Sequence, residues 1–353
     1  MDAMRNPLRS LRYSLLDRAL ARGLLPDPLL VAGARAGARA RIARESRGGV
    51  EEQERRLAQT VGRMREGDIA ELPAAANRQH YELPAEFFEL FLGPRLKYSG
   101  GYWPQPDSDL ATSEEAMLAL TCERAGVADG MSVLDLGCGW GSLSLWICER
   151  YPNATVQAVS NSASQRAYIE SVRDRRGFSE RLSVRTADAN AFEPGRRFQR
   201  VISVEMFEHM RNWQELMRRI STWLEPQSGR LFVHVFSHRR LAYEFAGTWA
   251  AERFFTAGRM PSHDLLPRFQ HDLELIETWA VPGTHYARTL DAWLKRLDAH
   301  ADRARELLSE AAGARDARRA FAAWRLFLIS TREMWGYRAG QEWMVSHYLL
   351  GPR

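Results

Sequence analysis

The stretch VLDLGCGWGSLSLWICER, residues 133–150, places three glycines between an apolar run and an amphipathic segment. The run predicts a buried strand, and the segment after Gly141 predicts a helix. Gly137, Gly139 and Gly141 let the backbone approach a ligand closely, and the first N–H groups of the helix would face its polar atoms. Asp135 stands two residues before the first glycine. We therefore predict a nucleotide-type pocket at this loop.

The strand before this loop is one of a series. Short β-branched runs alternate with helical or polar sequence, which predicts an α/β fold with a parallel sheet. These runs occupy residues 132–137, 154–160, 182–188, 200–206 and 230–236. Two further runs, 273–282 and 342–350, predict two more strands with a long helical insertion between them. This insertion is expected to lie outside the sheet.

The same pattern divides the chain into regions. Residues 1–95 are expected to be helical, because apolar residues recur at helical spacing in the segment that precedes the core. We expect the ligand-binding core at 96–240 and an aromatic lid segment at 241–272. Residues 273–353 are expected to complete the sheet and to carry the helical insertion, at about 289–340, which would cover the substrate.

Composition narrows the class of partner. The 353 residues carry a net charge of +5, which only weakly favours acidic partners. The arginines are scattered among acids and no RNA-binding module is recognisable, so we expect no nucleic-acid partner. No run approaches about 20 apolar residues, so we expect no membrane span. The Arg- and Leu-rich N-terminus allows peripheral membrane contact, but acidic residues interrupt it and a helix packed on its own domain is favoured.

The three cysteines, Cys122, Cys138 and Cys148, lack CxxC spacing, so we expect neither a disulfide framework nor a zinc site. A reducing, cytoplasmic setting is the simplest expectation. The sequence leaves the oligomeric state open, and a homodimer is one alternative.

Details of the glycine loop narrow the choice of nucleotide cofactor. The GxGxG spacing is tighter than the GxGxxG of dinucleotide-binding proteins. The second strand ends in Ser160, Asn161 and Ser162 instead of the acid that usually holds an NAD ribose. NAD is therefore disfavoured.

A second cluster, VEMFEHM at 204–210, sets Glu205, Glu208 and His209 within five positions. If a helix follows the strand, all three side chains share one face at the carboxyl edge of the sheet, where open α/β sheets bind ligands. One interpretation is an acid/base cluster that faces a substrate. A second is local capping or pairing, with only Glu205 facing the cavity. Metal ligation is the weakest, because no further ligand accompanies the cluster at suitable spacing.

Longer motifs carry a family resemblance. The DxGxGxG pattern resembles motif I of class I S-adenosylmethionine-dependent methyltransferases. Together with HYELPAEFFELFLGPRLKYSGGYW (80–103), SNSASQ (160–165), SVEMFEHM (203–210) and HYARTLDAW (285–293), it resembles the cyclopropane-fatty-acid synthase-like methyltransferases. The match is closer to their coclaurine N-methyltransferase-like branch. It implies a Rossmann-like sheet, mostly parallel with an antiparallel final strand, and S-adenosylmethionine as cofactor, released as S-adenosylhomocysteine.

Two positions depart from the cyclopropane synthases. The chain reads YSGGYW where those enzymes resemble YSCAYW, so Gly100 replaces a cysteine associated with their bicarbonate site. Glu205 stands where they carry a small residue. His234, Glu208 and Tyr286 do match polar positions of that site. The departures favour transfer to the nitrogen of a small amine or heterocycle, and a fatty-acyl phospholipid methyltransferase or cyclopropane synthase is the alternative.

The resemblance also implies site residues. The candidate cofactor contacts are Tyr98, Ser99, Asp135, Gly137, Gly139, Gly141, Asn161, Gln165, Asp188 and Ala189. Asp188 has a second interpretation as a helix N-cap. Aromatic faces attract cations, so aromatic residues dominate the substrate side, although any one of them can instead be packing. The candidates there are Tyr81, His234, Phe254, Phe255, Tyr286, Trp324 and Phe327.

The chemistry gives the cluster its expected roles. Methyl transfer from a sulfonium is an in-line displacement, and an amine must lose its proton before it can attack. The site therefore needs positioning and a proton acceptor. We expect Glu205 and Glu208 to bind the cationic amine, and His209 to act either as the base or as a residue that orients a glutamate.

Overall fold

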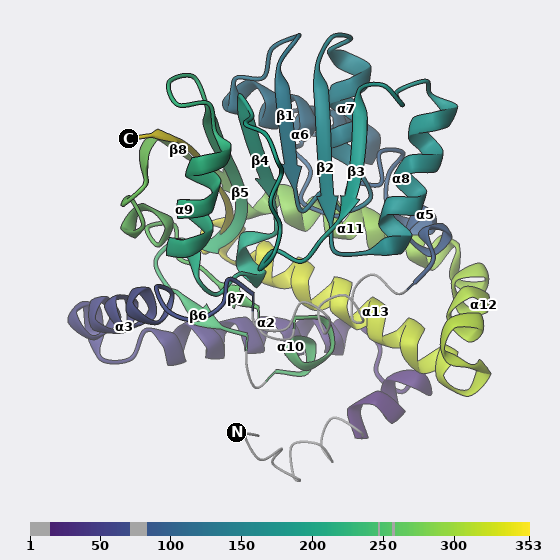
Figure 1. Ribbon diagram of the computed structural model, residues 1–353. Coiled ribbons are helices and arrows are strands. Elements are labelled where there is room, and N and C mark those ends of the chain that lie inside the picture. Colours follow the sequence, from purple (N-terminus) through teal and green to yellow (C-terminus); the bar gives the residue numbers. More distant parts are fainter. Residues whose placement is uncertain (1–14, 71–82, 246–247, 256–257) are drawn as a thin grey trace.

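The computed structural model describes residues 15–70, 83–245, 248–255 and 258–353. At its centre lies a seven-stranded sheet with the strand order β3-β2-β1-β4-β5-β9-β8 (Figure 1). The strands are β1 (Ser132–Leu136), β2 (Thr155–Ser160), β3 (Leu182–Thr186), β4 (Arg200–Val204), β5 (Arg230–His238), β8 (Leu273–Pro282) and β9 (Trp343–Pro352). Strands β1 to β5 pair in parallel, whereas β9 runs antiparallel to β5 and β8. The predicted α/β class, with a mostly parallel sheet and an antiparallel final strand, is confirmed.

Helices cover both faces of the sheet because alternate strand residues point in opposite directions. On one face, Val133 packs with helices α6 (Leu110–Ala125), α7 (Ser142–Arg150) and α8 (Ala163–Arg175). On the other face, Leu134 shares a cluster with residues of the helices α3 and α9. These two helices are Gly49–Arg63 and Trp213–Trp223.

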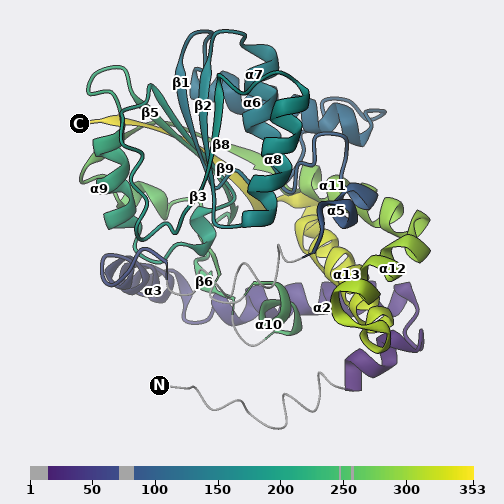
Figure 2. The same ribbon diagram turned by 45° about the vertical axis from the view of Figure 1, so that its right-hand side comes forward.

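A further layer of helices lies at one end of the sheet (Figures 1 and 2). It contains α2 (Asp27–Glu45), α5 (Ala85–Phe91), α10 (Trp249–Phe254), α11 (Gly283–Ala299), α12 (Ala301–Ala312) and α13 (Ala314–Trp335). Helices α11 to α13 form the insertion between β8 and β9. The two short strands β6 (Tyr243–Glu244) and β7 (Arg259–Met260) flank α10 and pair antiparallel.

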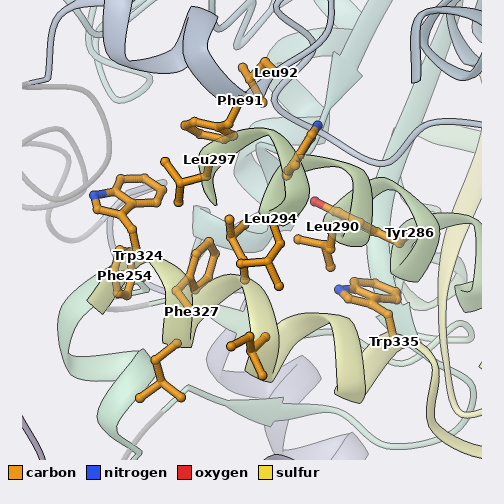
Figure 3. Packing of buried hydrophobic residues seen from close by; sticks show 14 of the residues in the cluster. Phe91, Leu92, Phe254, Tyr286, Leu290, Leu294, Leu297, Trp324, Phe327 and Trp335 are labelled. Atoms are coloured by element: carbon orange, nitrogen blue, oxygen red, sulfur yellow. The ribbon is translucent and has the colours of Figure 1, made fainter. Parts of the chain in front are cut away.

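Apolar residues at helical spacing hold this layer together. Tyr286, Leu290, Leu294 and Leu297 project from α11, and Trp324, Phe327 and Trp335 project from α13. Figure 3 shows the two sets facing one another. Trp335 stacks on Tyr286 with ring centroids 4.5 Å apart. Helix α10, which lies in the segment expected to be a lid, therefore shares one apolar core with the insertion α11 to α13.

Within the described ranges, none of the helices combines the length and the apolar character that a membrane crossing requires.

Asp17 fastens the N-terminal helical segment to this layer. Its buried carboxylate accepts a hydrogen bond from Trp249 Nε1 at 2.8 Å and forms ion pairs with Arg253 and Arg319. These partners belong to α10 and α13. One buried charge thus joins three segments that lie far apart in the sequence.

We expect Asp17→Asn to lower the free energy of unfolding by about 1–2 kcal/mol, because the arginines lose a buried counter-charge but keep partial access to water. Denaturant unfolding measures this change. Asp302→Asn is the control, since that side chain is 98% exposed and also pairs with an arginine. Equal effects in the two variants would contradict the role given to Asp17.

Candidate active site

A cavity of about 440 Å³ lies between the glycine loop and the helical layer. Its wall includes residues of the loop after β1, the end of β4, and helices α2, α11 and α13. The volume is within the range that small-molecule sites occupy. The cavity therefore brings the two motifs identified in the sequence to one place.

The glycine loop has the backbone that its sequence predicts. The φ angles of Gly137, Gly139 and Gly141 are +88°, +53° and +79°, in the left-handed region. A Cβ atom on Gly137 would lie 2.9 Å from Cβ of Met206, and one on Gly141 would lie 2.7 Å from Cγ1 of Ile169. A Cβ on Gly139 would meet no atom within 4 Å. Space beside Gly139 is thus open, and Gly139 itself lines the cavity.

Buried polar atoms around the cavity fit a polar ligand. Trp140 Nε1, Ser142 Oγ, Gln165 Nε2 and Trp293 Nε1 have no hydrogen-bond partner among the described residues. All four residues line the cavity. Because buried polar atoms are normally paired, these four are suited to the polar groups of a nucleoside and an amino acid. The site fits the cofactor that the resemblance implies.

Asp135 is a buried member of this wall. Its carboxylate accepts a hydrogen bond from Ser144 Oγ at 2.6 Å, which ties the end of β1 to α7. Burial raises the pKa of Asp135 to about 6, against the effect of that hydrogen bond.

The cofactor candidates divide into two groups. Those that line the cavity are Tyr98, Ser99, Asp135, Gly137, Gly139 and Gln165. Four others are not part of its lining: Gly141, Asn161, Asp188 and Ala189. Asp188 accepts a hydrogen bond from the backbone N–H of Asn190 at 2.8 Å within a turn. The N-cap interpretation of Asp188 is wrong, because no helix begins between β3 and β4. The contacts of all ten with the cofactor stay predictions.

Glu205 is held at the cavity wall by an unusual backbone. Its φ angle is +49°, which is uncommon for a residue other than glycine, and its N–H donates to the carbonyl of His234 at 2.8 Å. The side chain accepts two hydrogen bonds, from Tyr286 Oη at 2.8 Å and from the N–H of Gly100 at 3.2 Å. Strain at such a position is a frequent mark of a functional residue.

The electrostatics of Glu205 depend on a neighbour that the sequence analysis missed. Burial raises the pKa of Glu205, while the charge of Lys97 and the hydrogen bond from Tyr286 oppose that shift. Lys97 is buried and lines the cavity, and its Nζ donates to Ser99 Oγ at 2.5 Å and to the carbonyl of Gly100 at 2.7 Å. Burial lowers the pKa of Lys97 to about 8. A buried ammonium thus favours the ionised form of Glu205.

The single helical face expected for the cluster does not form. The left-handed backbone of Glu205 interrupts the path from β4, and only a short 3₁₀ turn, Phe207–His209, follows. Glu208 is fully buried away from the lining, accepts the N–H of Phe236 at 2.7 Å, and leaves its Oε2 without a hydrogen-bond partner in the described part of the chain. Burial and the charge of Glu205 raise its pKa well above the ordinary value.

His209 lies in the cavity wall, and its ring is nearly parallel to that of Phe255 at a centroid distance of 6.4 Å. Burial lowers its pKa to about 4, so the ring is neutral at pH 7. The structure thus sets Glu205 and His209 at the cavity and Glu208 behind it. Their catalytic roles stay predictions.

The substrate-side candidates are similarly distributed. Tyr286, Phe255 and Phe327 line the cavity. Phe254 stacks on Phe327 at 4.5 Å, outside the lining, and Trp324 packs edge-on against Phe254 at 5.2 Å. His234 lies behind Glu205, and Tyr81 lies outside the described residues. Across the described chain, no three His, Cys, Asp or Glu side chains are placed to hold a metal ion.

The sequence matches the model of a known protein family. The model for mycolic acid cyclopropane synthetase matches residues 71–336. The chain belongs to this family. The predicted methyltransferase class and its cofactor, S-adenosylmethionine, are thereby confirmed.

Two relatives illustrate the range of the family. The chain is 36% identical to (S)-coclaurine N-methyltransferase of Thalictrum flavum subsp. glaucum, over 98% of this chain and 97% of that enzyme. It is 28% identical to cyclopropane-fatty-acyl-phospholipid synthase of Escherichia coli (strain K12), over 62% of this chain and 55% of that enzyme. Both parts of the predicted resemblance are confirmed.

Solved structures agree with this assignment. The crystal structure of coclaurine N-methyltransferase bound to N-methylheliamine and S-adenosylhomocysteine superposes with a TM-score of 0.92. It is 35% identical in sequence and covers 96% of this chain and 99% of that one. A cyclopropane synthase from Mycobacterium tuberculosis, 23% identical, superposes with a TM-score of 0.66 over 80% of this chain and 99% of that one, and shares the fold.

Proposed function

We propose that this methyltransferase transfers its methyl group to the nitrogen of a small, largely apolar amine of the alkaloid type. The observation that carries the proposal is Glu205, a carboxylate fixed at the wall of an aromatic cavity beside the buried cation Lys97. Relatives named for alkaloid N-methylation support it. They include (S)-coclaurine N-methyltransferase and, at 33% identity, pavine N-methyltransferase of Thalictrum flavum subsp. glaucum.

The residues of this chain supply binding, orientation and a proton acceptor. When bound, S-adenosylmethionine provides the electrophilic methyl group. The carboxylate of Glu205 attracts the ammonium form of the substrate and accepts its proton, so that the nitrogen lone pair becomes free to attack. Tyr286 and the N–H of Gly100 fix the carboxylate in place. His209 lies in the same wall, and its pKa, lowered by burial to about 4, makes it a weaker candidate for the base than Glu205.

The apolar lining determines which amines fit. Phe255 and Phe327 present aromatic faces to the cavity, and Trp335 contributes a third next to Tyr286. Such faces attract a cationic nitrogen by roughly 0.5–2 kcal/mol per contact. We infer a compact cyclic amine with apolar substituents rather than a highly charged substrate.

A two-arm assay tests the proposal. Purified enzyme and S-adenosylmethionine are incubated with a panel of cyclic secondary amines, and in parallel with phospholipid vesicles that carry unsaturated acyl chains. We expect S-adenosylhomocysteine and an N-methylated product in the amine arm. Turnover in the lipid arm alone would overturn the proposal in favour of the fatty-acyl alternative.

The charge of Lys97 should affect how kcat/KM depends on pH. In the wild type, kcat/KM is expected to fall as the pH drops through the raised pKa of Glu205, because the carboxylate must be ionised. Lys97→Met removes the opposing charge, so the pKa of Glu205 rises further and this acidic limb moves to higher pH. Activity at pH 7 should fall several-fold, and the two enzymes should converge above about pH 8, where Lys97 itself becomes neutral.

The matched control for this prediction is Lys295→Met. Lys295 is the only other lysine in the sequence, and its side chain is 77% exposed on α11. This variant loses the same charge at an exposed position outside the cavity lining and should keep the wild-type pH profile. Identical profiles for Lys97→Met and the wild type would contradict the electrostatic role of Lys97.

A further inference from the structure

A line of contacts runs from the edge of the domain to Glu205. Arg124 Nη1 lies 2.8 Å from His347 Nδ1, and His347 Nε2 lies 3.0 Å from His234 Nδ1. His234 Nε2 then lies 3.4 Å from Glu205 Oε1, within reach of an electrostatic contact but without hydrogen-bond geometry, since Nε2 has no hydrogen-bond partner among the described residues. We call these three residues, Arg124, His347 and His234, the histidine relay.

The sheet places the two histidines side by side. His234 on β5 and His347 on β9 are direct partners in the antiparallel ladder, and both are fully buried. Arg124 reaches them from α6, with its guanidinium 4.9 Å from the ring centroid of Trp279 on β8. Three separate elements therefore hold the relay, and its ring positions follow from the strand register.

The chemistry of Arg124 determines where the protons of the relay lie. A guanidinium has donors only, so His347 Nδ1 must accept. A neutral His347 then carries its proton on Nε2 and donates to His234 Nδ1. A neutral His234 in turn carries its proton on Nε2, the atom that faces Glu205. Both rings are neutral at pH 7, because burial lowers the pKa of His234 and of His347 well below the ordinary value.

We propose that Arg124 is a positioning residue for methyl transfer, because it fixes through His347 and His234 the tautomer that presents an N–H group to the carboxylate of Glu205. This inference rests on the proposed role of Glu205 in amine methylation. An N–H dipole aimed at this carboxylate from 3.4 Å favours its ionised form. Loss of the relay should therefore slow methyl transfer without removing the cofactor site.

The same chemistry excludes a second role for the relay. A proton wire needs an outer end that can take up or release a proton, whereas the guanidinium of Arg124 stays protonated in proteins. The proton that Glu205 accepts cannot leave through His234 and His347 to Arg124. That proton therefore needs another route.

The test combines a spectroscopic and a kinetic readout on the full chain. In wild-type protein with ¹⁵N-labelled histidine, the imidazole shifts of His234 and His347 should both report a proton on Nε2. In Arg124→Met, His347 loses its fixed donor, and the Nδ1–H form should become populated. With a cyclic secondary amine as substrate, kcat should fall about tenfold, because one buried polar contact contributes a free energy of this order. Affinity for S-adenosylmethionine should stay at the wild-type level.

Two further variants make the result specific. Arg124→Lys retains a donor and should restore part of kcat. Arg196→Met removes another arginine that stacks on an aromatic ring, Phe198 at 4.8 Å, and should change neither readout. A wild-type His234 protonated on Nδ1, or unchanged kcat in Arg124→Met, would overturn the proposal.

The spectroscopic arm also separates this inference from the proposed function. The tautomers are measured on the protein alone and do not depend on which substrate is methylated. Absence of amine turnover by the wild type would reject the proposed function, whereas a wrong tautomer in an active wild type would reject only the relay.

Discussion

Glu205→Gln is expected to lower kcat/KM for a basic amine at least about 100-fold, the lower range for loss of a positioned acid/base group. The amide keeps the shape of the side chain but cannot accept a proton and does not attract an ammonium ion. Affinity for S-adenosylmethionine should stay close to that of the wild type, because the polar atoms suited to the cofactor lie on other residues, such as Gln165 and Trp293. Steady-state kinetics and calorimetric binding of the cofactor measure the two effects.

Glu208→Gln is the matched comparison. Burial and the charge of Glu205 raise the pKa of Glu208 well above the ordinary value, which favours the protonated acid that glutamine resembles in shape and charge. Its loss of kcat/KM should be much smaller than that of Glu205→Gln. Equal losses in the two variants would contradict the assignment of the proton acceptor to Glu205.

Gly139→Ala is expected to weaken the binding of S-adenosylmethionine at least about tenfold, because a methyl group would enter the space that the ligand needs. Gly139 lines the cavity, and a Cβ at this position meets no protein atom within 4 Å. The cost to stability should be only about 1–2 kcal/mol, the cost of a left-handed backbone in alanine. Calorimetric titration and denaturant unfolding separate the two quantities.

Two other glycines provide controls for this prediction. Gly130 also has a left-handed backbone and open space around its Cβ position, but it is exposed and outside the cavity lining. Gly130→Ala should therefore lose similar stability and retain cofactor affinity. Gly137→Ala should lose more stability than either, because its Cβ collides with Met206 at 2.9 Å. Wild-type cofactor affinity in Gly139→Ala would contradict the placement of the cofactor at this loop.

The sequence was sufficient for the sheet and the loop. Alternating β-branched runs and the glycine spacing are local properties, so β1 to β5 and the turn after β1 could be predicted without any tertiary contact. Strands β8 and β9 were also predictable from their own composition. The family motifs added the antiparallel direction of β9, which local sequence does not determine.

The arrangement of Glu205, Glu208 and His209 was harder to predict from the sequence. A helix after β4 is the ordinary expectation, and the left-handed φ of Glu205 has no local signal such as glycine or asparagine. That one residue separates Glu208 from the cavity. A helical pattern alone therefore placed two carboxylates on a face where the structure presents one.

Contacts between residues far apart in the chain could not be predicted from the sequence, for a different reason. The charge of the buried Lys97 acts on Glu205 from a loop 108 positions earlier in the chain, and Arg124, His347 and His234 meet only through packing and strand register. A weak signal did exist for Lys97, which is one of two lysines in a chain with 49 basic residues of the Lys and Arg types. Arginine does not lose its proton in proteins, whereas lysine readily shifts its pKa when buried.

The central claim is that Glu205 takes a proton from the substrate amine. Tetrahydroisoquinoline and tetrahydroquinoline test it directly, because these isomers have the same size but only the first is mostly protonated at neutral pH. The measurement is the rate of methyl transfer to each isomer by the wild type and by Glu205→Gln under single-turnover conditions. We expect a large loss in the variant for tetrahydroisoquinoline and a small loss for tetrahydroquinoline. Equal losses for both isomers would show that Glu205 is not the proton acceptor.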